Sequence, residues 1–106
     1  MSESKRILLV CGMGMSSGFL ATSARKAAKK LGINYQIEAR SETEVSSFLS
    51  SIDGLLIGPH YSQKLETFRK EAQPYQVPVE VIPEKIYGMI DGRGLIEFIQ
   101  KTLFKK

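Results

Sequence analysis

The sequence predicts an α/β fold, with a four-stranded parallel sheet in the strand order 2-1-3-4 and helices on both faces. Four short segments of apolar or alternating residues are each followed by a segment in which apolar residues recur at helical spacing. This alternation is typical of parallel sheets joined by right-handed crossovers. The 106 residues, 42 % hydrophobic and 25 % charged, contain no internal repeat or linker. We therefore expect one three-layer domain over residues 1–106, and the composition excludes disordered, collagen-like and coiled-coil chains.

The first predicted strand lies in the middle of the sheet. Residues 7–10, Ile-Leu-Leu-Val, form a continuous apolar run, which is typical of a strand buried on both faces. A turn rich in glycine and serine follows at 11–17, and we expect a helix over 18–31 that Gly32 ends. The apolar residues of this helix share one face. They are Leu20, Ala24, Ala27, Ala28 and Leu31.

The second predicted strand, residues 33–39, lies at a sheet edge because apolar residues alternate with polar ones along it. Ser41 and Glu44 then form a capping-box pattern, which predicts the start of a short helix. The apolar residues of that helix are Val45, Phe48 and Leu49.

The second half of the chain repeats the alternation. Residues 55–57 form a second buried strand, closed by Gly58-Pro59, and residues 79–82 form a fourth strand between two prolines. Between them a helix ends at Pro74, and its apolar positions are Leu65, Phe68 and Ala72. We expect a loop or one helical turn over 83–94. A final amphipathic helix carries Leu95, Phe98, Ile99 and Leu103.

The cysteine and histidine content excludes several classes of protein. With one cysteine and one histidine the chain can form neither an internal disulfide nor an ordinary structural zinc site. No apolar run approaches the ~18 residues that cross a bilayer. Lys5 and Arg6 precede an apolar run as in a signal peptide, but Gly12 and Gly14 break that run early. We therefore expect a cytoplasmic protein. Its net charge of +4 is compatible with nucleic acid, an anionic small molecule, an acidic partner or no specific partner.

The chemistry is predicted where the first strand meets the first helix. In such sheets ligands bind at the carboxyl ends of the strands, where the turn 11–17 lies. Gly12 and Gly14 permit backbone conformations in which successive N–H groups form an anion nest. The positive end of the following helix and the hydroxyls of Ser16 and Ser17 add to it. The turn therefore predicts a pocket for a group such as phosphate.

Cys11 stands at the rim of this predicted pocket. A thiol at a helix amino terminus has its pKa lowered from ~8.5 to roughly 3.5–7.5, so Cys11 would be a thiolate near neutral pH without a histidine base. The same amides would then hold a phosphoryl group bonded to sulfur. The alternative is that Cys11 only ends a buried strand.

Other phosphate-binding motifs fit the spacing less well. Gly14 and Gly18 are too close for a nucleotide P-loop, and Phe19 stands where its lysine would be. The dinucleotide fingerprint would need glycine at Ser17. Low-molecular-weight tyrosine phosphatases carry a cysteine, five residues and an arginine, but Ser17 also takes the arginine position here. Neither Asp53 nor Asp91 is obviously placed as their general acid. A site without that arginine favours holding a phosphoryl group over hydrolysing it.

The turn resembles the C-x-x-G-M-S-[TS] loop of enzyme IIB of the lactose/cellobiose type, a component of the bacterial sugar phosphotransferase system. The resemblance continues at 56–59, 78–82 and 87–92, with the same order of elements. It implies a fold similar to the low-molecular-weight tyrosine phosphatase. It also implies phosphate binding by the loop residues after the cysteine, namely Gly12, Met13, Gly14, Met15, Ser16 and Ser17.

The resemblance further implies a reaction and its partners. Cys11 would accept a phosphoryl group from a phosphohistidine of enzyme IIA and pass it to a sugar held by the membrane permease, enzyme IIC. The sugar would be a β-linked disaccharide such as cellobiose or lactose. No metal, nucleotide or organic cofactor and no nucleic acid is expected. The chain would be a cytoplasmic monomer that visits the inner face of the membrane.

Two other classes stay open: a phosphatase-like or arsenate-reductase-like enzyme using Cys11, and a noncatalytic phosphate-sensing module. His60, Tyr87 and Asp91 follow the third and fourth strands and would border the site. A solvent-facing loop explains His60 as well, and turn formation or helix capping explains the other two. The basic residues of the first helix are interpreted as a solvated face or a surface for an acidic partner or lipid. They are Arg25, Lys26, Lys29 and Lys30.

Overall fold

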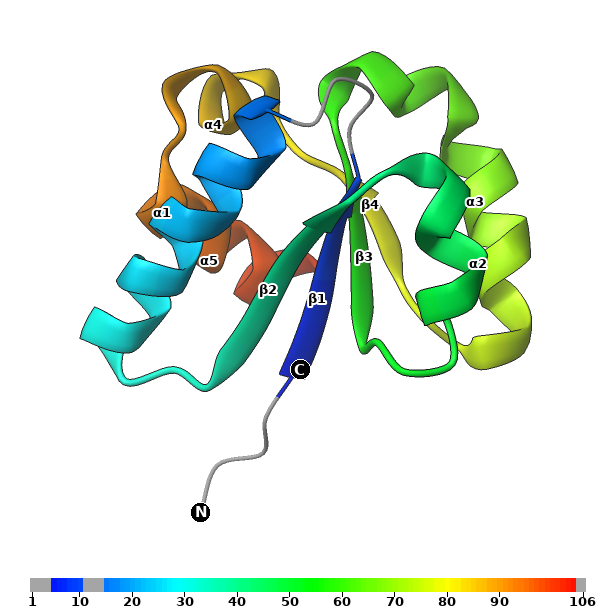
Figure 1. Cartoon of the computed structure of the whole chain (residues 1–106), viewed down its shortest axis with the longest axis horizontal. Helices are drawn as coiled ribbons and strands as arrows, with labels where there is room; N and C mark the ends of the chain where they lie inside the picture. Colours follow the sequence, from blue (N-terminus) through cyan, green and yellow to red (C-terminus); the bar gives the residue numbers. More distant parts are fainter. Residues whose placement is uncertain (1–4, 11–14, 105–106) are drawn as a thin grey trace.

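A parallel four-stranded sheet in the order β2-β1-β3-β4 lies at the centre of the computed structural model, as predicted (Figure 1). The structure describes residues 5–10 and 15–104, and of residues 15–17 and 60 it describes the backbone alone. The strands have the following bounds: β1 (Lys5–Val10), β2 (Tyr35–Arg40), β3 (Gly54–Ile57) and β4 (Val79–Val81). Because β1 pairs with both β2 and β3, the turn that follows β1 leaves from the interior of the sheet.

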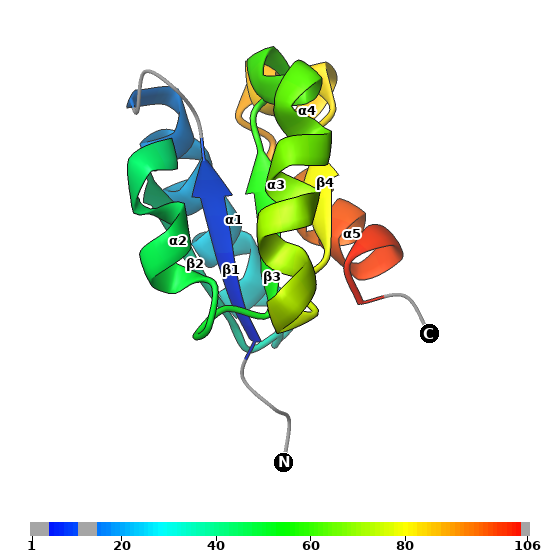
Figure 2. The same cartoon turned by 90° about the vertical axis from the view of Figure 1, so that its right-hand side faces the viewer.

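Helices cover both faces of the sheet, which gives three layers (Figures 1 and 2). One face carries α1 (Met15–Leu31), α4 (Glu84–Met89) and α5 (Gly92–Thr102). The other face carries α2 (Val45–Phe48) and α3 (Leu65–Ala72). Short 3₁₀ segments lead into or out of the second group: η1 (Glu42–Glu44), η2 (Pro59–Lys64) and η3 (Gln73–Tyr75).

The residues of β1 divide the core into two clusters because successive side chains of a strand point to opposite faces. Ile7 and Leu9 pack in the cluster under α1 and α5, whereas Leu8 and Val10 pack in the cluster under α2 and α3. All four are at most 1 % exposed. The continuous apolar run therefore marks a strand buried on both faces, as predicted.

The edge position of β2 is also confirmed. Ile37 is buried, while Gln36 and Arg40 are exposed, so only one face of the strand is dry. Gly32, which was predicted to end the preceding helix, has a φ of 72°. This left-handed conformation is the usual helix-terminating one and favours glycine.

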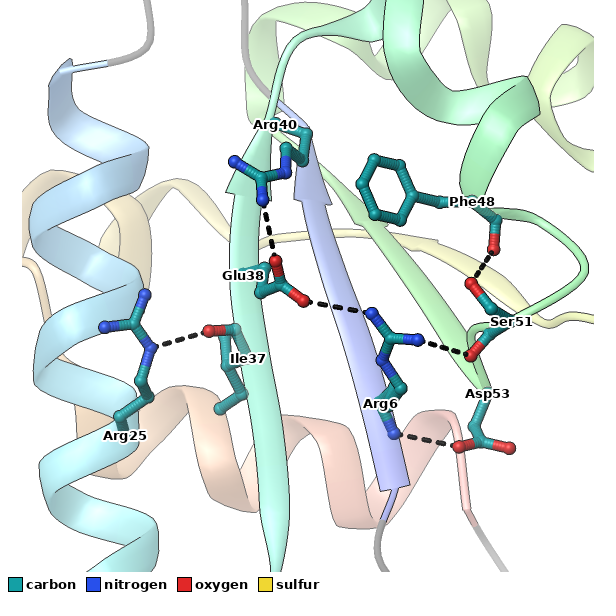
Figure 3. Close-up of polar contacts among 8 residues, drawn as sticks. All are labelled: Arg6, Arg25, Ile37, Glu38, Arg40, Phe48, Ser51 and Asp53. Atoms are coloured by element: carbon teal, nitrogen blue, oxygen red, sulfur yellow. Dashed lines mark hydrogen bonds and ion pairs between the residues drawn. The ribbon is translucent and has the colours of Figure 1, made fainter.

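An arginine covers each open edge of the sheet. The Lys5 N–H donates to the Asn34 carbonyl, and successive carbonyls of a strand point to opposite sides. The Ile37 carbonyl, three residues on, therefore points away from β1. Arg25 Nε donates to it at 2.6 Å (Figure 3). At the opposite edge, Arg69 Nε donates to the outward carbonyl of Val79 at 3.3 Å. Such cover lowers the tendency of exposed strands to pair with other chains.

The first helix ends at Leu31 as predicted, but its start and the burial of Leu31 were predicted wrongly. The helix begins at Met15 rather than at residue 18, because the backbone of Ser16 and Ser17 forms its first turn. Serine is compatible with that position although it is also common in turns. Leu31, predicted on the buried face, is 45 % exposed because it lies in the last turn, beyond the cover of the neighbouring elements.

The segment 83–94 holds more helix than predicted. Pro83 precedes α4, Glu84 lies in its first turn, and Ile90 ends it with a φ of 50°. Asp91 then caps α5, with its side chain accepting from the Gly94 N–H at 2.9 Å. The predicted capping role of Asp91 is therefore confirmed, and α5 begins three residues before Leu95.

The capping box at Ser41 and Glu44 is confirmed as well, although it opens the 3₁₀ segment η1 before α2. The Ser41 N–H donates to the Glu44 carboxylate at 3.2 Å. None of the helices in the described ranges is long and apolar enough to cross a membrane.

Candidate functional site

The predicted site is the segment between β1 and α1, at the carboxyl edge of the sheet. β1 ends at Val10, which is fully buried, and α1 begins at Met15. The intervening Cys11, Gly12, Met13 and Gly14 lie outside the described residues, as do the side chains of Met15, Ser16 and Ser17. What the structure fixes is where this loop starts, where it ends and what stands on either side of it.

The loop ends at the positive pole of a long helix. α1 has 17 residues, and its first turn holds no acidic side chain. The unpaired N–H groups of such a helix start carry a partial positive charge equivalent to roughly half an elementary charge. This partial charge would therefore attract an anion held between β1 and α1, and no carboxylate of the same turn would repel that anion.

The end of β1 is fixed to the end of β3. The Gly58 N–H donates to the Val10 carbonyl at 2.8 Å, so the residue before Cys11 is held in place by the neighbouring strand. The Ile82 N–H in turn donates to the Ile57 carbonyl at 2.9 Å. These two bonds extend the ladder past the last strand residues and order the backbone beside the loop.

One flank of this edge is closed by contacts between η1 and η2. The Tyr61 hydroxyl donates to Glu42 Oε1 at 3.1 Å, and Lys64 Nζ pairs with Glu42 Oε2 at 3.2 Å. Because η1 follows β2 and η2 follows β3, these contacts join the two strands that flank β1. The amino-acid sequence does not reveal this cluster, because the register of the sheet decides which segments meet. Its only sequence signal is Gly58-Pro59, which follows β3.

α4 follows β4, and the turn after α4 packs against α1. The Ser23 hydroxyl donates to the Ile90 carbonyl at 3.2 Å and accepts from the Gly92 N–H at 3.2 Å, which ties α1 to this turn. A Cβ at Gly92 would overlap the backbone of Ser23, so the close approach requires glycine. Tyr87 is half-buried and packs against the core under α1.

The two aspartates both make structural hydrogen bonds. Asp53 accepts from the Arg6 N–H at 2.8 Å at the start of β1, the opposite edge of the sheet from the loop (Figure 3). Asp91 is occupied as the cap of α5. His60 lies in η2 after β3, and its side chain is outside the described part of the structure.

Two further electrostatic observations concern the described ranges 5–10 and 15–104. The Asp and Glu side chains of these ranges form no group of three that could hold a metal ion. Burial raises the pKa of Tyr35 above its ordinary value of 10.0. Tyr35 begins β2, so it lies at the amino edge of the sheet, opposite the predicted site.

A family comparison agrees with the geometry of this edge. The profile of the family described as "PTS system, Lactose/Cellobiose specific IIB subunit" matches residues 6–98. The matched region runs from the second residue of β1 into α5 and so includes all of the sheet but its first residue, together with the predicted loop.

Three similar proteins are named as EIIB components of phosphotransferase systems. The oligo-beta-mannoside-specific EIIB component of Bacillus subtilis is 37 % identical over 93 residues, 88 % of this chain and 90 % of that protein. The galactose-specific and cellobiose-specific EIIB components of Lactococcus lactis are each 34 % identical, over 83 % of this chain and 86 % of the relative.

Two solved structures share the fold. The lactose-specific IIB domain of Streptococcus pneumoniae superposes with a TM-score of 0.85 over 94 % of this chain and 98 % of that one, at 11 % identity. The cellobiose-specific IIB protein of Borrelia burgdorferi gives a TM-score of 0.72 at 34 % identity, over 90 % of this chain and 87 % of that one.

Proposed function

The chain belongs to the lactose/cellobiose-specific IIB subunits of the sugar phosphotransferase system, and we propose that Cys11 is the residue that carries its phosphoryl group. A IIB subunit is a sugar-specific component of a phosphotransferase system, so its chemistry is transfer of phosphate toward a sugar. Cys11 is the one cysteine of the sequence and stands directly after the central strand.

The reaction has two steps at sulfur. In the first, the Cys11 thiolate attacks the phosphorus of a phosphohistidine on enzyme IIA, the N–P bond breaks with its electron pair returning to the imidazole, and an S–P bond forms. In the second, a sugar hydroxyl oxygen attacks phosphorus, the S–P bond breaks, and an O–P bond forms. The hydroxyl proton leaves to solvent, and the thiolate is regenerated.

The position of the loop supports this proposal. Val10 is held by Gly58, and Met15 begins a helix whose first turn is free of carboxylates. A thiolate and a dianionic phosphoryl group are both stabilised by amides at a helix start. The same setting therefore favours the nucleophile before transfer and the phosphorylated sulfur after it.

The residues that would bind the phosphoryl group are those between the cysteine and the first turn of α1. Backbone N–H groups would do most of this work, with hydroxyl donors at two positions. These residues are Gly12, Met13, Gly14, Met15, Ser16 and Ser17. No resident metal or organic cofactor is part of the proposal.

The proposed partners follow from the two steps. Enzyme IIA supplies the phosphohistidine, and the membrane permease IIC holds the sugar that receives the group. The monomeric chain would act in the cytoplasm, at the inner face of the membrane during the second step. We propose a β-linked disaccharide or oligosaccharide as the sugar, because the names of two relatives specify cellobiose and an oligo-beta-mannoside.

Intact-mass analysis after incubation with phosphoenolpyruvate, the general phosphotransferase proteins and a IIA subunit tests the proposal. We expect one phosphoryl group on the wild-type chain and none on Cys11→Ser. His60→Gln is the matched control, because His60 is the only histidine and would carry a phosphoryl group that missed the sulfur. It should be phosphorylated like the wild type.

Other outcomes point elsewhere. Steady release of inorganic phosphate that Cys11→Ser abolishes would indicate a phosphatase-like hydrolase. Absence of both adduct and turnover would indicate a phosphate-sensing module. Loss of the adduct in His60→Gln, with its retention in Cys11→Ser, would place the chemistry on the imidazole.

A further inference from the structure

A hollow of about 610 Å³ lies between α1 and the connection of α4 to α5. Its described lining comes from residues 23–31 of α1 and from residues 89–93. These two segments run side by side along one flank of the molecule, joined through the Ser23 hydroxyl (Figure 1). The phosphoryl chemistry proposed above makes no use of this hollow.

The apolar side chains that line the hollow are exposed to solvent. Met89 is 73 % exposed, Leu31 is 45 % exposed and Ile90 is 38 % exposed. Ile90 also has a φ of 50°, a left-handed conformation that a β-branched side chain rarely adopts. A patch of apolar side chains exposed to solvent is typical of an interaction surface.

Cations surround this apolar part. Lys26 and Lys30 lie one turn apart on α1, and Arg93 lines the same hollow from the start of α5. Within the described ranges neither lysine forms an ion pair, and Arg93 has only an exposed contact with Glu97 at 3.8 Å. The one carboxylate of the lining, Asp91, is engaged as the cap of α5. The lining thus carries three positive charges against one negative charge.

The two walls of the hollow are fixed before any partner arrives. Ser23 bonds to both Ile90 and Gly92, and Gly92 packs directly on the backbone of Ser23. A site whose walls are already ordered loses less conformational entropy on binding.

We propose that this hollow is a docking surface for an acidic segment of a partner protein that carries an apolar anchor residue. The anchor would lie against Leu31, Met89 and Ile90, and carboxylates on either side of it would face Lys26 and Lys30. The charges give complementarity, and the concave apolar floor gives a place for the anchor. An anionic membrane would match the charges but would make no use of a concave floor.

The docking surface is separate from the loop. Residues 23–31 lie about 12 to 24 Å along α1 from its first residue, at 1.5 Å per residue. A partner bound there would leave the carboxyl edge of the sheet open. The proposal does not depend on phosphoryl transfer, and the test below does not measure it.

The test is an NMR titration of the full-length, ¹⁵N-labelled chain with the acetylated octapeptide EDELFEDE. We expect saturable shifts of backbone amides confined to residues 23–31 and 89–93. The matched peptide EDEGGEDE lacks the anchor, and KRKLFKRK reverses the charge. Both should bind at least about tenfold more weakly, because each removes one of the two contributions.

Variants of the chain separate charge from apolar contact. Lys26→Glu with Lys30→Glu should weaken EDELFEDE binding by about tenfold or more, and Met89→Ser should weaken it by a few fold. The control, Lys70→Glu with Lys101→Glu, makes the same change in net charge on α3 and at the end of α5. It should bind like the wild type, and the spectra of all variants report whether they are folded.

Three results would overturn the proposal. One is no saturable binding of EDELFEDE, and another is equal binding of EDEGGEDE. The third is that vesicles of phosphatidylglycerol and phosphatidylcholine shift the same amides while the peptide does not. That result would assign the surface to the membrane.

Discussion

Cys11 is the residue on which the proposed chemistry depends, and the reactivity of its thiol reports the electrostatics of the loop. We expect alkylation by iodoacetamide to follow an apparent pKa clearly below ~8.5, because amides at a helix start stabilise the thiolate. Gly14→Val should raise this pKa and weaken phosphoryl binding, since a β-branched residue disturbs an amide nest without touching the sulfur. A thiol with an ordinary pKa in the wild type would contradict the proposed loop.

Two glycines in different backbone conformations give a matched test at the same scale. Gly32 has a φ of 72°, whereas Gly88 lies inside α4, and an added Cβ would meet nothing within 4 Å at either position. Gly32→Ala should therefore lower the free energy of unfolding by about 1 kcal/mol through backbone strain alone. Gly88→Ala should raise it by roughly 0.5–1 kcal/mol, because alanine is the better helix former.

Urea denaturation of the two variants measures both changes. Opposite signs are the expected result. Equal destabilisation by both substitutions would mean that backbone conformation is not what distinguishes these positions.

At the scale of elements, the arginines that cover the sheet edges are the most direct targets. Arg25→Met removes a 2.6 Å hydrogen bond to Ile37 and leaves the outward carbonyl of this residue open. We expect a loss of about 1 kcal/mol in the free energy of unfolding and increased self-association at high concentration. Lys29→Met, one helical turn further along the same exposed face and without a side-chain hydrogen bond among the described residues, should change neither quantity. The two are measured by urea denaturation and by sedimentation velocity, and equal effects of both variants would rule out edge cover as the cause.

The sequence predicted the elements best where apolar periodicity is strong. The run at Leu8 and Leu9 and the alternation around Ile37 fixed the central and edge strands, because burial on two faces or on one leaves different patterns. Helix ends were predicted less well. Ser16 and Ser17 suit a turn as well as a first helical turn, and only the path from β1 to α1 decides between them.

The candidate site shows the same division. The end of β1 and the helix start could be placed at the carboxyl edge from the order of strands alone, whereas the role of Cys11 and its glycines stays a prediction. The contacts of Glu42 with Tyr61 and Lys64 could not, because they join segments about 20 residues apart whose meeting depends on sheet register. The position of Asp53 at the opposite edge likewise follows from the fold and not from its neighbours in the sequence.

At the scale of the whole molecule, the sheet couples two hydrophobic clusters into one structure. Leu8 and Leu9 are adjacent in β1, at most 1 % exposed, and belong to different clusters. We expect Leu8→Ala and Leu9→Ala each to cost about 2–5 kcal/mol, because each leaves a cavity in a packed layer. Since β1 contributes side chains to both clusters, each variant should still unfold in one transition.

Thermal unfolding followed by far-ultraviolet and near-ultraviolet circular dichroism checks this expectation. Coincident transitions would support a single cooperative unit. A variant in which one layer melts well before the other would show that the two clusters are independent.

The phosphorus NMR spectrum of the intact chain, recorded after phosphorylation through a IIA subunit, tests the central claim most directly. A single resonance in the range of S-phosphorylated thiols, which disappears when membranes containing the permease and the sugar are added and reappears as a sugar phosphate, is the expected result. A resonance in the phosphoramidate range, or one of inorganic phosphate alone, would contradict the assignment of Cys11 as the carrier.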